Sequence, residues 1–219
     1  PPTPTPTPPP TPTPTPGEAS TPREGAAHTA ERGWLEGIRI LDLCNVIAGP
    51  TVGMMCARWG ADVIKIDPPE PRYGPLVMVG FGLLANRGKR SVLLNLRTAE
   101  GHAAFARLVA GADVVTFNGI DRQLEALGIT PARLKAMNPR AILYMLKAFA
   151  GPFGGPRAES VGYDDLTQAT TGIMARFGGS LRHAEEHAHI GTVDVVTGFA
   201  GVLATCLALL RRERAGVAE

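Results

Sequence analysis

Cysteine is scarce in the 219-residue sequence, and the three that occur, Cys44, Cys56 and Cys206, are odd in number and lie in apolar segments. A disulfide framework is therefore disfavoured, and a reducing, cytoplasmic setting fits better. No stretch combines a basic flank, an apolar core and a cleavage site as a secretory signal does. The apolar run from Val195 to Leu210 is too short and too closely bounded by arginines to predict a membrane span, so we expect a soluble protein without a membrane partner.

An excess of charge of one sign is also lacking, because 22 basic residues face 20 acidic ones and the net charge is +2. The basic residues are scattered among acids and are not interleaved with aromatics, which make up 5% of the chain. Nucleic acid is therefore not an expected partner. The hydrophobic content of 44% suits one globular domain.

The first 16 residues alternate between proline and threonine, a pattern that resists helix and sheet and favours an extended coil. Together with the polar stretch that follows, they predict a disordered leader or linker over residues 1–33, because such a segment cannot bury enough surface to offset chain entropy. The sequence does not begin with Met, so we expect it to be a piece of a longer protein.

Strand and helix patterns alternate after Trp34. Apolar runs predict strands, and capping or breaking residues bound the helices between them. The predicted strands cover 38–43, 61–67, 92–96, 113–118 and 141–149, and the predicted helices cover 51–59, 98–109, 122–127, a short segment from 130, and a start at 163–169. This alternation predicts an α/β fold with a mainly parallel, Rossmann-like sheet and flanking helices.

The turn after the first strand lacks the Gly-x-Gly-x-x-Gly pattern of a dinucleotide site and reads Val46-Ile47-Ala48-Gly49-Pro50. An NAD site is therefore disfavoured. The loop rich in Pro and Gly after the second strand ends in a basic cluster, Arg87, Lys89 and Arg90. That cluster is either a solvated edge, the commoner case, or a phosphate clamp, and position alone does not decide between them.

The segment 183–189 carries His183 and His187 at the spacing of one helical turn, which is a possible metal site. It lies between glycines in a predicted loop, and no second ligand cluster accompanies it. A solvated loop is the better interpretation, and no metal is expected.

Asp194 follows Gly191, Thr192 and Val193 and precedes the long apolar run. We predict a buried helix with Thr192 as its N-cap, which places Asp194 in the first turn, where free N–H groups and the helix dipole favour an ionised carboxylate. Such a carboxylate is a possible nucleophile towards a thioester. From these residues alone, a simple capping role is the commoner alternative.

Several stretches occur together in one order: GIRILDL (37–43), AGP (48–50), GADVIKID (60–67), Asn86 to Leu96 with Thr98, NPR (138–140), GYD (162–164) and Asp194. This ordered set resembles the class III CoA-transferases, which include formyl-CoA and carnitine CoA-transferases and the related alpha-methylacyl-CoA racemases. The resemblance implies a CoA-transferase that moves CoA between an acyl-CoA and a carboxylic acid through an aspartyl anhydride and an aspartyl thioester.

By this resemblance Asp194 is the catalytic aspartate, which outweighs the capping interpretation. Coenzyme A is implied as a co-substrate, with no tightly bound cofactor. The residues implied to bind coenzyme A are Val46, Leu96, Arg97 and Asn118. The residues implied to line the acyl pocket are Ile47, Ala48, Tyr163 and Asp164.

The racemase branch is similar but has a histidine where this chain has Tyr163. A phenol with a pKa of about 10 is a poor substitute for imidazole as a base, so transfer is favoured over racemisation. Formyl-type members carry glutamine where Ile47 stands, which favours larger or more apolar acceptor acids. The chain also has Gly119-Ile120-Asp121-Arg122 in place of the usual Phe-Arg-Pro-Gly.

Members of the family continue into a small domain, so we interpret residues 34–219 as a large-domain portion truncated before it. We expect a homodimer or a partner chain that supplies the missing half, and little activity from this portion alone. The alternative is a non-catalytic CoA-binding half that pairs with a complete partner, or a racemase-like enzyme.

Overall fold

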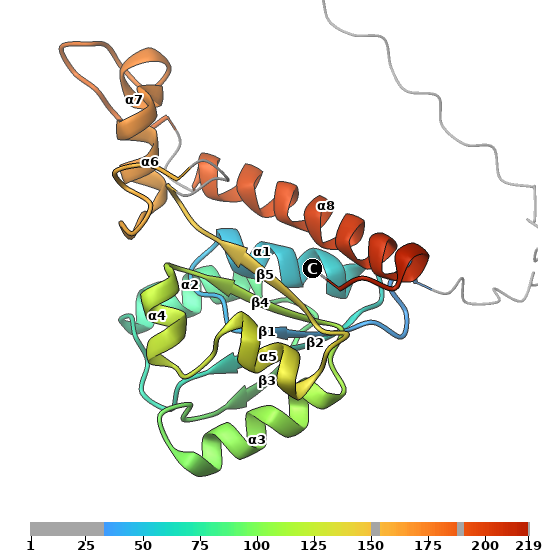
Figure 1. Ribbon diagram of the computed structural model, residues 1–219. Coiled ribbons are helices and arrows are strands. Elements are labelled where there is room, and N and C mark those ends of the chain that lie inside the picture. The colour runs from blue at the N-terminus through green and yellow to red at the C-terminus, as the bar shows by residue number, and fades with distance from the viewer. Residues whose placement is uncertain (1–32, 150–153, 188–190, 219) are drawn as a thin grey trace, which may run out of the picture. The chain divides into compact units, whose positions relative to one another are not determined.

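The computed structural model describes residues 33–149, 154–187 and 191–218. Nearly all of the predicted leader, residues 1–32, lies outside the described residues. Five parallel strands form one sheet in the order β3-β2-β1-β4-β5 (Figure 1). The strands are β1 Arg39–Asp42, β2 Asp62–Asp67, β3 Arg90–Leu93, β4 Val114–Asn118 and β5 Ile142–Leu146. The predicted α/β class and parallel sheet are confirmed, with β3 lying a little earlier than its predicted range.

Helices cover both faces of the sheet (Figure 1). Alternate strand residues point to opposite faces, so Ile40 packs in one core cluster and Leu41 in the other. On the Ile40 side lie α1 (Ala48–Arg58) and α8 (Thr192–Ala215), and on the Leu41 side lie α3 (Ala99–Ala110), α4 (Asp121–Ala126) and α5 (Pro131–Met137). The inner strands β1, β2 and β4 are mostly buried and apolar because helices cover both faces there, which is typical of parallel sheets, whereas the edge strand β3 is largely exposed.

Helix starts follow the capping chemistry at two predicted positions. The Thr98 hydroxyl accepts a hydrogen bond from the Gly101 N–H at 3.1 Å, and Thr130 accepts one from the Arg133 N–H at 3.1 Å. The predicted turn at Ala48–Pro50 is wrong, because these residues form the first turn of α1. A proline is tolerated there because the first N–H groups of a helix have no partner inside it.

Helix α2 (Pro75–Ala85) lies in the region predicted as a Pro/Gly-rich loop. The segment is apolar almost throughout, so it lacks the alternation of polar and apolar residues by which an amphipathic helix is recognised. Two of its large side chains, Leu76 and Leu83, are 87% and 70% exposed. Its apolar character therefore does not correspond to burial in the sheet core.

The segment after β5 leads through α6 (Asp164–Thr171) and α7 (Ile173–Arg176) to α8. The predicted start of a helix at 163–169 is confirmed by α6. In the described residues of the histidine segment, up to His187, no helix forms, so the one-turn spacing of His183 and His187 does not apply. Among all described residues no group of three or more His, Cys, Asp or Glu side chains is placed to hold a metal ion.

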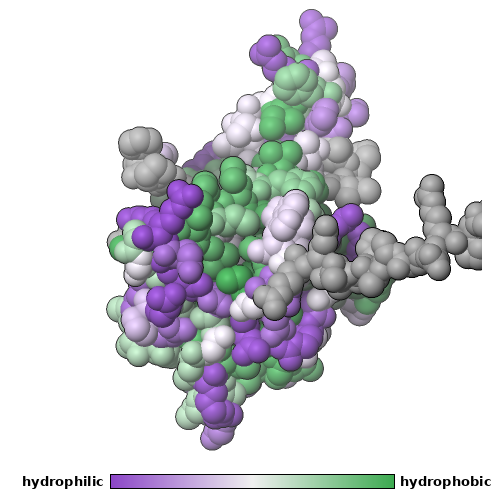
Figure 2. Space-filling model, turned by 90° about the vertical axis from the view of Figure 1, so that its right-hand side faces the viewer, coloured by the Kyte–Doolittle hydropathy of each residue, from purple (hydrophilic) through white to green (hydrophobic). Residues whose placement is uncertain are grey.

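Helix α8 has 24 residues and packs against α1 with one face, through Gly198, Gly201 and Val202. Its opposite face is an outer stripe of exposed apolar residues, so the prediction of a buried helix is only half right. The outer stripe consists of Val196, Phe199, Leu203, Leu207 and Leu210. Figure 2 shows one face on which apolar side chains reach the surface beside hydrophilic ones.

By length and composition α8 is the one helix in the described part of the chain that could cross a membrane. However, it lies along α1 within the α/β unit, and near its end the Arg212 guanidinium reaches Asp113 at 2.7 Å. Packing on α1 therefore accounts for the apolar inner face of α8, but not for its outer stripe.

Candidate active site

The sheet order reverses beside β1, because the chain proceeds from β1 to β2 on one side and from β4 to β5 on the other. In open parallel sheets a crevice forms at the carboxyl ends of the strands where the order reverses. The segments that follow β1 and β4 carry Asn45 and Asn118, which meet at this point. A binding site is therefore expected between these two segments.

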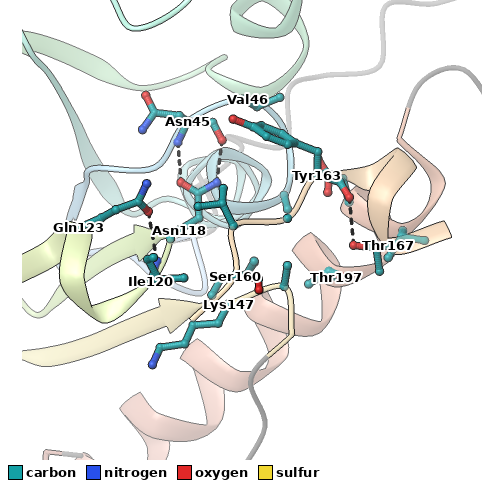
Figure 3. A pocket seen from close by; sticks show the side chains of 18 of the residues that line it. Asn45, Val46, Asn118, Ile120, Gln123, Lys147, Ser160, Tyr163, Thr167 and Thr197 are labelled. Atoms are coloured by element: carbon teal, nitrogen blue, oxygen red, sulfur yellow. Dashed lines mark hydrogen bonds between the residues drawn. The ribbon is translucent and has the colours of Figure 1, made fainter. Parts of the chain in front are cut away.

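The turn after β1 is strained. Val46 has a φ of 67°, in the left-handed region that a β-branched residue rarely adopts. The Asn118 side chain holds this turn, because its Oδ1 accepts from the Asn45 N–H at 2.7 Å and its Nδ2 donates to the Asn45 carbonyl at 2.8 Å (Figure 3). The pair of bonds joins residues far apart in sequence and keeps Val46 in its unusual conformation.

A small cavity of about 130 Å³ opens beside this turn. Its walls come from the ends of β1, β4 and β5, from the segment before α6 and from the first turns of α8. Residues on its walls include Asn45, Val46, Ala48, Arg72, Tyr73, Asn118, Lys147, Tyr163, Asp194 and Thr197. Most of these side chains are polar, and Figure 3 shows Tyr163, Asn118 and Lys147 around the space.

Asp194 enters this cavity from the first turn of α8. The N-cap of α8 is Gly191, with a φ of 69°, and Thr192 is the first helical residue, so the prediction of Thr192 as N-cap is wrong. A capping bond does come from elsewhere, because the Asp194 N–H donates to Asp164 Oδ1 at 2.8 Å. Asp194 itself is thus capped by a carboxylate from α6.

The surroundings of Asp194 raise its pKa to about 6. Burial is the largest cause, followed by the negative charge of Asp164, while a hydrogen bond from the Ala48 N–H lowers the pKa. Burial and a like charge both disfavour the ionised form, and they outweigh the helix terminus. At pH 7 about nine in ten molecules still carry the carboxylate, which is more basic than an ordinary aspartate.

A second, larger cavity of about 520 Å³ lies at the carboxyl ends of β1, β2 and β3. Two of the residues implied to bind coenzyme A, Leu96 and Arg97, line it. Asn45 and Arg72 line both cavities, so the two spaces adjoin along these residues. A long ligand that occupied both would pass Asn45 and Arg72.

The implied site residues divide into three groups in the structure. Val46, Ala48, Asn118, Tyr163 and Asp194 line the small cavity, and Leu96 and Arg97 line the large one. Ile47 and Asp164 line neither. Ile47 is buried, with its Cδ1 against Gly191, and Asp164 lies behind Asp194.

Sequence reasoning missed Arg72 and Tyr73, which lie in the segment predicted only as loop. The Tyr73 hydroxyl is 3.4 Å from that of Tyr163, so the two phenols meet at the cavity wall. Burial, and then the bond to Tyr163, raises the pKa of Tyr73 to about 12, so it stays protonated. Nothing in the local pattern of residues 68–74 signals this pairing, which depends on a contact across 90 positions.

Two of the three cations of the basic cluster, Lys89 and Arg90, are paired with acids away from the two cavities. The Lys89 ammonium is buried and bonds to Asp42 Oδ2 at 2.6 Å and to the Pro50 carbonyl at 2.8 Å. Burial alone would raise the pKa of Asp42, but Lys89 and Lys65 hold it below its usual value. Arg90 pairs with Asp62 at 2.7 Å, at the opposite, amino-terminal end of the strands. Through its bond to the Pro50 carbonyl, Lys89 therefore stabilises the first turn of α1.

Comparison with known proteins places these features in context. The model of CoA-transferase family III matches residues 35–219. The chain is 44% identical over 185 residues to the CoA-transferase/lyase DddD of Marinomonas sp. (strain MWYL1), covering 84% of this chain and 22% of that protein. It is 35% identical over 196 residues to the succinate–glutarate CoA-transferase of Agrobacterium fabrum, covering 83% and 48%.

Among solved structures, a CAIB/BAIF family protein from Brucella suis superposes with a TM-score of 0.77 at 35% identity. The match covers 86% of this chain and 52% of that one. The chain thus spans about half the length, or less, of the relatives it matches.

Proposed function

Because the chain belongs to CoA-transferase family III, whose model matches residues 35–219, we propose that it supplies the nucleophile and part of the coenzyme A site of a CoA-transferase. The observation that carries the proposal is the position of Asp194, whose half-buried carboxylate lies on the wall of the small cavity. Its raised basicity strengthens it as a nucleophile, and it is still ionised at neutral pH.

In the proposed reaction a carboxylate oxygen of Asp194 attacks the thioester carbonyl of an acyl-CoA. The C–S bond breaks, which gives a mixed anhydride and the thiolate of coenzyme A. The thiolate then attacks the aspartyl carbonyl, releasing the donor acid as its carboxylate and leaving an aspartyl thioester. The carboxylate of the acceptor acid repeats these two steps in reverse order, so that the new acyl-CoA leaves and Asp194 is regenerated.

Coenzyme A is proposed to occupy the large cavity and to extend its thiol into the small one. Leu96 and Arg97 line the first part of this route, and Val46 lies on the second part. Arg72 lies where the two cavities adjoin, and in the described part of the chain it makes no hydrogen bond or ion pair. A free guanidinium there is available for a phosphate or for a substrate carboxylate.

The role proposed for Asn118 is indirect. Its amide is committed on both sides to the backbone of Asn45, so it shapes the Val46 turn along which the thioester would lie. The acyl group is proposed to lie by Ala48 and Tyr163. Ile47 packs against Gly191 and does not line the small cavity. The polar side chains that do line it, rather than Ile47, would therefore set the choice of acceptor acid.

A test of the nucleophile uses succinyl-CoA as donor and glutarate as acceptor, as the name of one relative suggests. After incubation, hydroxylamine should convert one activated carboxylate to a hydroxamate, which peptide mass spectrometry would locate at Asp194. Asp194→Asn should abolish the label. The control is Glu213→Gln, an exposed carboxylate of the same helix, which should leave labelling unchanged. A label on another acid, or labelling retained in Asp194→Asn, would overturn the assignment.

The racemase alternative is tested separately. Tyr163 is proposed to position the acyl group and not to act as a base, because its hydroxyl meets that of Tyr73 at 3.4 Å on the cavity wall. A 2-methylacyl-CoA incubated in heavy water should therefore keep its alpha hydrogen. Rapid deuterium exchange with an intact thioester would favour racemisation.

We also propose that the 219-residue chain turns over slowly by itself and works with a second copy or a partner chain. The support is that relatives are about twice as long or longer, and that α8 presents an uncovered outer stripe. A cytoplasmic location is proposed because the chain belongs to CoA-transferase family III. Addition of the remaining part of a family member should raise transfer from succinyl-CoA to glutarate, and efficient transfer by the chain alone would contradict the proposal.

A further inference from the structure

Gln168 of α6 is a fully buried polar side chain close to the proposed nucleophile, with 0% of its surface exposed. Its Oε1 accepts a hydrogen bond from the His187 N–H at 2.8 Å, and its Nε2 donates to Asp164 Oδ2. Both ends of the amide therefore have a partner. A buried amide that is satisfied at both ends is held in one orientation.

The orientation of this amide follows from the chemistry of its partners. A backbone N–H can only donate, so the amide oxygen must face His187. An ionised carboxylate can only accept, so the NH₂ group must face Asp164. Gln168 thus presents its NH₂ group to Asp164 as a hydrogen-bond donor, and its partners alone fix this orientation of the amide.

Asp164 is held from its other side by α8. Its Oδ1 accepts from the Asp194 N–H at 2.8 Å. The chain of contacts therefore runs from the backbone of His187 through Gln168 and Asp164 to the backbone of Asp194. It ties α6 to the first turn of α8 and leaves the Asp164 carboxylate no freedom to turn towards solvent.

We propose that Gln168 is a positioning residue for acyl transfer, whose amide holds the Asp164 carboxylate against the first turn of α8 so that its negative charge acts on Asp194. This inference rests on the proposed function. It assigns Asp164 a role behind the nucleophile rather than in the acyl pocket. Gln168 acts only through Asp164 and touches no reacting atom.

Other charged groups around Asp194 come from each element packed against it. Asp165 of α6 adds a second negative charge, and the Ala48 N–H of α1 stabilises the ionised form. Arg72 and Lys147 line the same cavity, as do the phenols of Tyr73 and Tyr163. Lys147 is paired with Asp121 at 2.5 Å, so its charge is partly offset. Asp164 is the acid with the largest effect on Asp194 in this group.

The test measures the rate of covalent acylation by succinyl-CoA as a function of pH, from acid-quenched samples and intact mass. In the native chain this rate should rise with pH with a midpoint of about 6, as Asp194 ionises, and level off above it. Asp164→Asn removes the charge and should move this rise to lower pH by about 0.5 to 1 unit. Gln168→Leu frees Asp164 and should move the rise in the same direction.

Gln168→Glu gives a sharper signature. A protonated glutamic acid offers a donor to Asp164 and an acceptor to the His187 N–H, as the amide does. Once ionised it repels Asp164 and the contact is lost. The variant should therefore follow the native profile at low pH, where the new acid is protonated, and the profile of Gln168→Leu at high pH, where it is ionised. The control is Thr171→Ala, an exposed position on the same helix, which should keep the native profile.

The outcomes separate this inference from the proposed function. If Asp194→Asn still acylates, the nucleophile assignment fails and the positioning role fails with it. If acylation occurs at Asp194 but the profile of Asp164→Asn equals the native one, only the positioning role is overturned. If Gln168→Leu does not fold, the Asp164→Asn and Gln168→Glu profiles still decide the question, and a Gln168→Glu profile equal to the native one at every pH counts against the positioning role.

Discussion

Val46 holds a backbone conformation that costs a β-branched residue free energy, and its side chain is only half-buried. A strained residue persists only where its surroundings over-determine it, as the two bonds from Asn118 to Asn45 do here. Strained residues of this kind are concentrated at functional sites. The turn at Val46 lies on the wall of the small cavity and beside the proposed path of the thioester.

Relieving that strain should make the protein more stable. Glycine adopts a positive φ without steric cost, so Val46→Gly should raise the free energy of unfolding by about 0.5 to 1 kcal/mol, after the entropy of the added glycine is counted. Urea unfolding of the two proteins would measure the difference. The matched change Val161→Gly, at an exposed valine with ordinary φ, should not stabilise. A stability loss in Val46→Gly similar to that of Val161→Gly would show that the turn stores no strain.

The ionised Asp194 should destabilise the folded protein at neutral and alkaline pH. Its pKa rises from the usual 3.8 to about 6 on folding, so the folded state binds the proton more tightly. The cost is present above pH 6 and disappears as the pH falls towards 4. Asp194→Asn should therefore raise the free energy of unfolding by about 1 to 2 kcal/mol at pH 8, allowing for partial exposure, and by little at pH 4.5. Urea titrations at the two pH values would contradict the assignment if the gain were the same at both.

At the scale of elements, two glycines let α8 approach α1. A Cβ at Gly198 would lie 2.7 Å from Thr51 Cβ and 2.9 Å from the Ala48 carbonyl, and one at Gly201 would lie 2.7 Å from Val52 Cγ2 of α1. Close approach of the helices is what brings Asp194 within reach of the Ala48 N–H.

Gly198→Ala should push the two helices apart and destabilise the fold by about 1 to 3 kcal/mol, although alanine is the better helix former. The control is Gly80→Ala in α2, where a Cβ meets nothing within 4 Å and stability should rise by about 0.5 to 1 kcal/mol. Thermal unfolding compares the two variants. Stabilisation by both substitutions would mean that the α1 and α8 contact tolerates the added methyl group.

The sequence predicts elements well where burial is two-sided or capping is local. The strands at 61–67 and 113–118 are mainly apolar runs between polar ends, interrupted only by Lys65 and Thr116, and the Thr98 side chain itself caps α3. Helix α2 escapes prediction because its pattern has no polar side. Asp194 can be found from its place before an apolar run and from the family resemblance.

Gln168 and Tyr73 could not be found from the sequence, because each has a partner outside its own segment, His187 for Gln168 and Tyr163 for Tyr73. Gln168 reads as an ordinary polar residue of a helix until its contacts with Asp164 and His187 are known. Asn118 is found by resemblance, but its contact with Asn45 across 73 positions appears only in the fold.

At the scale of the whole molecule, the outer stripe of α8 is a row of uncovered apolar side chains along the longest helix in the described part of the chain. Its members recur every three or four residues and are between 45% and 64% exposed. Monomeric proteins seldom leave such a row of large apolar side chains in water.

The purified chain should therefore self-associate at micromolar concentration and bind a hydrophobic dye. The double change Leu203→Glu and Leu207→Glu should shift sedimentation towards the monomer and reduce dye binding severalfold. Leu181→Glu, at a leucine that is 92% exposed and apart from the stripe, is the control and should change neither. A monodisperse native chain that ignores the dye would contradict this expectation.

The order of the elements along the chain also determines when the site is completed during synthesis. The turn at Val46 is made before Asn118, the residue that holds it, which follows only with β4, and Asp194 follows with α8 after all five strands of the sheet. Contacts between distant residues form late in folding, because a long loop must close first. During synthesis the strand ends are therefore in place before the proposed nucleophile is made, and Asp194 meets Asp164 only once α8 has followed α6.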